Sequence, residues 1–117
     1  MGLRAERVAG LLRRELADLI RREIEPELPS MISLTDVEVS RDLAHARVWI
    51  SVLEIEKAGE VMALLKEFAP QIRHRLAGRV RLRIVPELKF LHDTSTETGQ
   101  RIERLLDAAR KTHDEQE

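Results

Sequence analysis

The 117-residue chain contains no cysteine, few aromatic residues and no long apolar run. The absence of cysteine excludes a disulfide framework and a thiolate metal site, and it fits a reducing cytoplasm, where we expect the protein to act. No segment approaches the ~18 apolar residues of a membrane span, and no signal peptide is recognisable, so we expect no membrane partner. Aromatic residues make up only 3% of the chain, which argues against a stacking platform for bases.

Catalytic and metal-binding motifs are also missing. The chain has no G-x-S-x-G motif, no phosphate-binding loop of the G-x-x-x-x-G-K type and no histidine pair at a metal-ligand spacing. Only His92 and Asp93 are adjacent, and neighbours in a strand point to opposite faces. We therefore expect no enzyme activity, metal, cofactor or small-molecule substrate.

Charge is balanced over the chain but not along it. The formal net charge is −1, which argues against a protein that coats nucleic acid non-specifically and allows one that docks at a defined place. One segment, between Glu67 and Glu87, contains no acid and five arginines, namely Arg73, Arg75, Arg79, Arg81 and Arg83. Such a local cationic surface points to a polyanion, most commonly nucleic acid. The alternative is a solvated face whose arginine stems cover the edge of the core.

The apolar periodicity predicts helices and strands in alternation. Residues 4–25 repeat apolar side chains at helical spacing, whereas 32–40 and 44–52 alternate as the two strands of an antiparallel hairpin. Helical spacing returns over 60–80, and proline within it predicts two helices that meet at a kink formed by Phe68, Ala69 and Pro70.

The last third of the chain predicts one more strand and one more helix. Apolar residues on both sides of Pro86 indicate an edge strand or a strand that starts after the proline. A short helix is expected over 97–109. The fold class is therefore α+β, a single domain over residues 1–110 with a three-stranded sheet and helices on one face, followed by a short polar tail over 111–117.

Several short motifs lie in order along nearly the whole chain. They are Arg4-x-x-Arg7-Val8, Val37-x-Val39-Ser40-Arg41-Asp42-Leu43-x-x-Ala46-x-Val48, Ile72-Arg73-x-x-Leu76, Leu82-Arg83-x-x-Pro86-Glu87-Leu88-x-Phe90-x-x-Asp93, and then Gly99 with Arg101-Ile102. Together they resemble the ribosome-binding factor A family of bacteria. The resemblance implies a type II KH-like fold and a monomer that binds the free small (30S) ribosomal subunit and its ribosomal RNA. It also implies a role in late assembly, 5′-end maturation of 16S ribosomal RNA and cold adaptation, without catalysis.

The resemblance and the charge pattern together select candidate RNA-binding residues. They are Arg73, Arg75, Arg79, Arg81 and Arg83, with Lys89, Arg41, Arg4 and Arg7. Ordinary KH domains hold the nucleic-acid backbone with a GxxG loop, which this chain lacks. At the kink the family usually has Ala-x-Gly, where this chain has Phe68-Ala69-Pro70, and proline has a fixed φ whereas glycine is freer.

Other interpretations stay open at this stage. A protein-interaction module could use a sheet edge and the basic patch to bind an acidic protein. A DNA-binding regulator would lack an obvious helix-turn-helix. Trp49 could stack on a base or pack structurally. Arg7, Arg14 and Arg21 share one face of the first helix, but Asp18 and Glu25 lie there too, so a self-compensating surface and an RNA contact are both open.

Overall fold

The computed structural model describes residues 3–94 of the chain. Helix α1 spans Leu3–Leu19 and continues through a π-helical turn, Ile20–Ile24, and a 3-10 turn, Glu25–Glu27. Strands β1 (Ile32–Val39) and β2 (His45–Val52) follow, then a 3-10 turn (Ile55–Lys57), helix α2 (Ala58–Ala77) and strand β3 (Glu87–His92). The predicted α+β fold with a three-stranded sheet is confirmed. The helix expected over 97–109 and the boundary expected after residue 110 lie outside the described residues.

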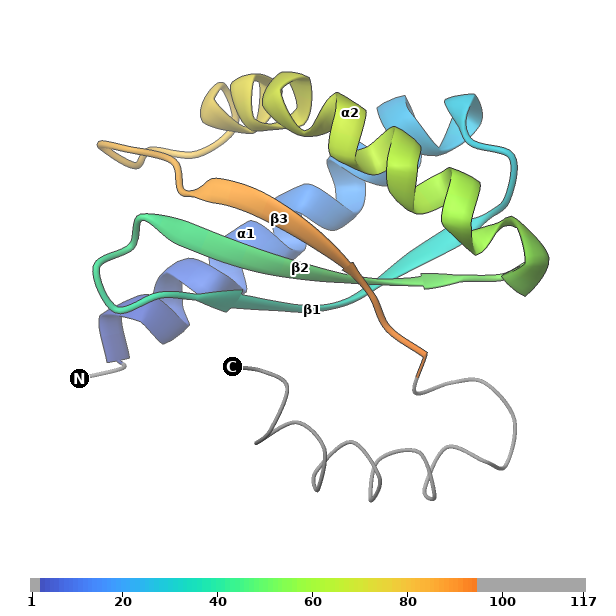
Figure 1. Ribbon diagram of the computed structural model, residues 1–117. Helices are drawn as coiled ribbons and strands as arrows, with labels where there is room; N and C mark the ends of the chain where they lie inside the picture. Colours follow the sequence, from blue (N-terminus) through green and yellow to red (C-terminus); the bar gives the residue numbers. More distant parts are fainter. Residues whose placement is uncertain (1–2, 95–117) are drawn as a thin grey trace, which may run out of the picture.

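Both helices cover the same face of the sheet, which has the order β1-β2-β3. Figure 1 shows α1 crossing behind the strands and α2 running along the top. Residues of β2 alternate between buried and more exposed as predicted, and the buried ones meet the apolar stripes of the two helices. Leu12, Leu16 and Leu65 are fully buried there. This single core fixes the relative position of α1 and α2, and therefore of the charges on them.

Strand β1 contains a bulge that its sequence requires. Its apolar residues change phase, because Ile32 and Leu34 are two apart while the next apolar residue, Val37, follows after three positions. The register with β2 shifts between Leu34 and Asp36, which leaves Thr35 as the extra residue. A regular strand would turn one of the two apolar sets to solvent, whereas the bulge turns both toward the core.

The segment around Pro70 differs from the prediction. Two helices were expected to meet at Phe68, Ala69 and Pro70, but α2 is one helix that runs through all three residues. Pro70 lacks an N–H and cannot bond to the carbonyl of Lys66, yet both residues are exposed, so water can satisfy that carbonyl. The ribbon of α2 changes direction between its green and yellow parts in Figure 1, without a break in the helix.

Strand β3 starts after Pro86, one of the two arrangements that the sequence predicted. The residues before it form no strand, and Ile84 in that segment is 66% exposed. Strand β3 pairs with β2 in parallel, so the chain must cross over between them, and α2 makes that connection. Within residues 3–94 no helix is long and apolar enough to cross a membrane.

Candidate nucleic-acid interface

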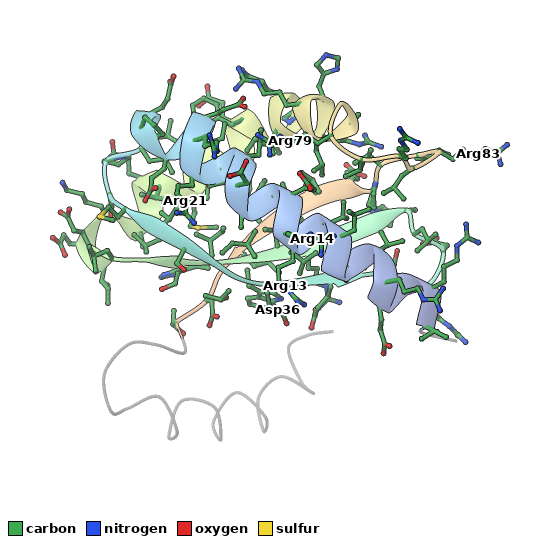
Figure 2. The ribbon with its side chains drawn as sticks, turned by 180° about the vertical axis from the view of Figure 1, so that it is seen from behind. Arg13, Arg14, Arg21, Asp36, Arg79 and Arg83 are labelled. Atoms are coloured by element: carbon green, nitrogen blue, oxygen red, sulfur yellow. The ribbon has the colours of Figure 1, made fainter. Side chains whose placement is uncertain are left out.

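The predicted arginine cluster of residues 73–83 contains arginines that form ion pairs with carboxylates and arginines that do not within residues 3–94. Arg79 donates to Asp18 at 2.9 Å and also lies 3.6 Å from Glu15 and 3.5 Å from Glu23. Arg75 pairs with Glu23 at 2.7 Å. These contacts join α2 to α1 and its π turn, and Figure 2 shows Arg79 between the two helices. We call this set of ion pairs the helix seam.

The helix seam perturbs the acid–base properties of its members. Hydrogen bonds from Arg22 and then Arg79 lower the pKa of Asp18 below its ordinary value of 3.8. The hydrogen bond to Asp18 in turn raises the pKa of the Arg79 guanidinium. Both shifts favour the charged forms, so the seam consists of ions at neutral pH. The arginines of the seam already have anionic partners, and an RNA phosphate would have to compete with them.

Arg73 has a structural contact of a different kind. Its Nε and Nη2 atoms donate to the carbonyl oxygen of Val85 at 3.1 and 2.8 Å. This fork holds the segment 81–86 against the C-terminal half of α2. The guanidinium keeps its full charge, because a carbonyl does not neutralise it, and the residue stays exposed.

Two hollows flank the segment 81–86, and Arg83 borders both. The first hollow, the end groove, has a volume of about 250 Å³ and is lined by Arg4, Val8, Asp42, Leu43, Ala44, Leu82, Arg83, Ile84 and Pro86. The second, the α2 hollow, has a volume of about 350 Å³ and is lined by Pro70, Arg73, His74, Ala77, Leu82, Arg83 and Val85. None of the described residues that line the α2 hollow is acidic, and Figure 2 shows Arg83 extending from one end of the molecule.

The turn between β1 and β2 forms one wall of the end groove. Ser40 Oγ donates to Asp42 at 2.7 Å, and the Ala44 N–H donates to the same carboxylate oxygen at 3.0 Å. These hydrogen bonds, that of Ser40 first, lower the pKa of Asp42. Leu43 has a φ of 62°, which a leucine rarely adopts and which the turn must hold in place. Among the described residues that line the end groove, Asp42 is the only acid, and its carboxylate accepts hydrogen bonds from its own turn.

The remaining predicted residues do not join one patch. Arg81 is exposed beside Arg83 in the same segment, and Arg7 is exposed one turn after Arg4 on α1. Arg41 borders a different hollow, together with Arg13 and Glu38. Lys89 lies on the sheet face opposite the helices, in register with Arg47, and Trp49 is half-buried on that same face. These assignments to RNA stay predictions.

The predicted site omits two exposed arginines, Arg14 of α1 and Arg21 of its π turn. Arg14 and Arg21 take part in no ion pair that involves residues 3–94, and neither does Arg7. The seven-residue spacing of Arg7, Arg14 and Arg21 places them on one helix face, but Asp18 and Glu25 on that face left ion pairs within the protein as an equal alternative. Over the described residues, no group of three or more histidine, aspartate or glutamate side chains is arranged to hold a metal ion.

The outer edge of β1 bears on the alternative of strand addition by a protein partner. The Ile32 N–H donates to Glu25 Oε2 at 2.9 Å, and the Val37 N–H donates to Asp36 Oδ1 at 2.8 Å. Asp36 also accepts from Arg13 at 3.0 Å, a pair that Figure 2 shows below α1. Carboxylates thus occupy two backbone donors that an added strand would need, which disfavours this edge as a docking site.

Comparisons with known proteins agree on one family. A family model described as ribosome-binding factor A matches residues 4–106. The ribosome-binding factor A of Xanthomonas euvesicatoria pv. vesicatoria is 44% identical over 104 residues, which cover 88% of this chain and 79% of that protein.

Solved structures lead to the same family. The crystal structure of ribosome-binding factor A from Thermus thermophilus matches with a TM-score of 0.65 and 26% identity, over 75% of this chain and 93% of that one. A homology model of the Thermus thermophilus factor, fitted into a cryo-EM map of a 30S–RbfA complex, matches with a TM-score of 0.62 and 28% identity, over 76% and 94% of the two chains.

Proposed function

Because this chain belongs to the ribosome-binding factor A family, we propose that it binds the free small (30S) ribosomal subunit and assists its late assembly. The assistance includes 5′-end maturation of 16S ribosomal RNA. The protein acts in the cytoplasm as a monomer and by docking on RNA, without catalysis. Support comes from the family membership and from the Thermus thermophilus relative, whose coordinates were fitted into a map of a 30S complex.

The main support for an RNA contact is the positive charge of the arginines at the end of the molecule around residues 81–86. Arg81 and Arg83 are exposed there and make no ion pair within the described part of the chain, and Arg73 and Arg4 border the adjacent hollows. Guanidinium groups bind phosphate oxygens through two parallel hydrogen bonds, so such a cluster suits an RNA backbone. The low aromatic content agrees with recognition of phosphates and shape and not of stacked bases.

A docking protein assists assembly by binding one state of the RNA more tightly than another. An equilibrium shifts only by the difference between the two affinities. The protein therefore has to bind the immature subunit more tightly than the mature one, and the gain or loss of phosphate contacts at residues 81–86 can supply that difference.

The proposal is tested by sedimentation of the tagged protein with a cell lysate on a sucrose gradient. We expect it to migrate with free small subunits and not with whole ribosomes. A protein that stays at the top of the gradient even at low salt would contradict the proposed function.

The residue assignment needs a matched pair of variants. Arg83→Glu reverses a charge at the two hollows, and Lys66→Glu reverses another exposed charge elsewhere on the surface, in the middle of α2. Loss of one charged contact of about 1.4 kcal/mol weakens binding of purified 30S subunits about tenfold, whereas the control changes it less than about twofold. Equal losses in the two variants would show that only overall charge matters.

A further inference from the structure

We propose that the outward face of α1 and its π turn is a second phosphate-binding surface, formed by Arg7, Arg14 and Arg21, and that its ligand is the RNA backbone of the small subunit. The inference rests on the proposed function and adds a contact surface that is separate from residues 81–86. We call these three residues the α1 row.

The α1 row is straight and exposed. Seven residues make almost two helical turns and a rise of about 10.5 Å, so the row spans about 21 Å along the helix. All three side chains are exposed, and α1 lies in front of the other elements in Figure 2, where Arg14 is labelled on the helix and Arg21 below its C-terminal end. The core-facing stripe with Leu12 and Leu16 lies on the opposite side of the helix, so Arg7 and Arg14 face away from the protein. Arg21 is exposed as well and borders a hollow between the π turn and the start of β1.

The two acids that could neutralise the α1 row are engaged elsewhere. Asp18 accepts from Arg22 at 2.8 Å and from Arg79 at 2.9 Å. Glu25 borders the same hollow as Arg21, but its Oε2 accepts from the backbone N–H of Ile32 at 2.9 Å, and Glu25 forms no ion pair with Arg21. The self-compensating surface that the sequence left open is therefore not formed, and the charge of the row is left for an external anion.

The arginines beside the α1 row provide an internal contrast. Arg13 pairs with Asp36 at 3.0 Å, and Arg22 pairs with Asp18 at 2.8 Å. Each is adjacent in sequence to a member of the row, on the same helix or its π turn. One helical segment thus carries arginines of two kinds, those with a carboxylate partner and those for which residues 3–94 provide none.

Small residues separate the members of the α1 row. Gly10 lies between Arg7 and Arg14, and Ala17 lies between Arg14 and Arg21. A Cβ atom at Gly10 would meet nothing within 4 Å, so packing inside the protein does not require glycine there. Glycine in a helix interior costs about 1 kcal/mol relative to alanine. Close approach of the RNA backbone to α1 between the arginines explains why glycine stands there despite this loss of stability.

RNA fits the α1 row better than a protein does. Stable protein interfaces have an apolar centre, and aromatic residues are enriched in it. The large exposed apolar residues of the described chain are Leu3, Met31, Leu53, Ile55 and Ile84. Met31 borders a hollow with Arg21 at one end of the row, and none of the five lies along the helix between Arg7, Arg14 and Arg21. A line of cations without an apolar centre is suited to a phosphate backbone, which is contacted by charge and shape.

The test compares two double variants of the same charge and almost the same position. Arg14→Gln with Arg21→Gln removes two members of the row, and Arg13→Gln with Arg22→Gln removes their partnered neighbours. Affinity for purified 30S subunits is measured from low to physiological salt. Each phosphate contact contributes about 0.7–0.9 to the log–log salt slope, so the row variant should lose about 1.4–1.8 of slope and at least tenfold in affinity. The control should keep its slope and bind within about threefold.

Circular dichroism and thermal unfolding accompany the binding data, and the row variant should unfold at the wild-type temperature. The same measurement on protein-free 16S ribosomal RNA should show the same loss. A loss with the subunit but not with the RNA would assign the row to an acidic ribosomal protein and overturn the proposal.

Two further outcomes separate this proposal from the proposed function. Equal binding by the row variant and the wild type, or equal losses in the row variant and the control, would remove the α1 row and leave ribosome binding intact. Failure of the wild-type protein to bind the subunit would overturn both.

Discussion

Arginines lie against the two sides of α1 in opposite situations. On the side toward α2, Arg79 and Arg75 lie among Asp18, Glu15 and Glu23 in the helix seam. On the outward side, the α1 row has no such partner within residues 3–94. The comparison shows that arginine content does not identify an RNA-binding surface by itself. The carboxylates within reach decide whether an arginine holds the fold together or is left for a phosphate.

Arg79→Glu tests the seam with the largest expected effect. The Arg79 side chain is only 24% exposed, and a carboxylate in its place would face three others. Loss of the charged hydrogen bonds together with the new repulsion should lower the free energy of unfolding by about 2 kcal/mol, as measured by urea denaturation. Arg79→Gln should be milder, because it removes the attraction and adds no repulsion. Equal, near-zero effects of both would show that the seam contributes nothing to stability.

Asp18→Asn probes the same seam through pH. The pKa of Asp18 is lowered in the folded state by Arg22 and Arg79, so its stabilising effect is present above the unfolded pKa and is lost as pH falls through the folded value. The melting temperature of the variant should therefore lie below that of the wild type at pH 6 and approach it below about pH 4. A difference that stays constant over this range would contradict an ionic role for Asp18.

Gly10→Ala tests whether RNA approaches the outward side of α1. An alanine Cβ has open space there, and the helix should gain up to about 1 kcal/mol of stability in urea denaturation. If the RNA backbone approaches α1 at this point, the same substitution should weaken 30S binding. A variant that is more stable and binds with unchanged affinity would show that no close approach occurs at Gly10.

Arg22→Gln should have the smallest effect. Its pair with Asp18 is a helical i, i+4 contact, and the Arg22 side chain is 71% exposed. Such pairs contribute about 0.3–0.5 kcal/mol. Stability should fall by no more than this in urea denaturation, and the affinity for 30S subunits should not change. A loss of affinity comparable to that of Arg14→Gln would break the distinction between partnered and unpartnered arginines.

The sequence predicted the fold correctly where the pattern of apolar residues depends only on neighbouring positions. Alternation in β2 and helical spacing in α1 need only nearby residues, and both elements were predicted with their buried faces. Pro70 led to two helices where there is one, because its exposed position, where water can compensate for the lost hydrogen bond, is a property of the folded chain. The bulge at Thr35 was implicit in the phase change of the apolar residues of β1.

The sequence predicted which arginines belong to the candidate site but not which of them form ion pairs. The positions of the arginines are in the sequence, but the seam pair of Arg79 and Asp18 joins residues 61 positions apart. Only the packing of α2 against α1 decides which acids lie within reach of which arginines. The predicted RNA-binding set therefore contains Arg75 and Arg79, which have partners, and omits Arg14 and Arg21, which have none in the described chain.

The most direct test of the account uses Arg75→Gln with Arg79→Gln against Arg81→Gln with Arg83→Gln, measuring for each the melting temperature and the affinity for purified 30S subunits. We predict opposite outcomes for the two variants. The first should have lower stability and near-normal binding, and the second should have normal stability and at least tenfold weaker binding. If the first variant keeps its melting temperature and loses as much affinity as the second, the seam arginines are RNA contacts and the distinction between the two kinds of arginine is wrong.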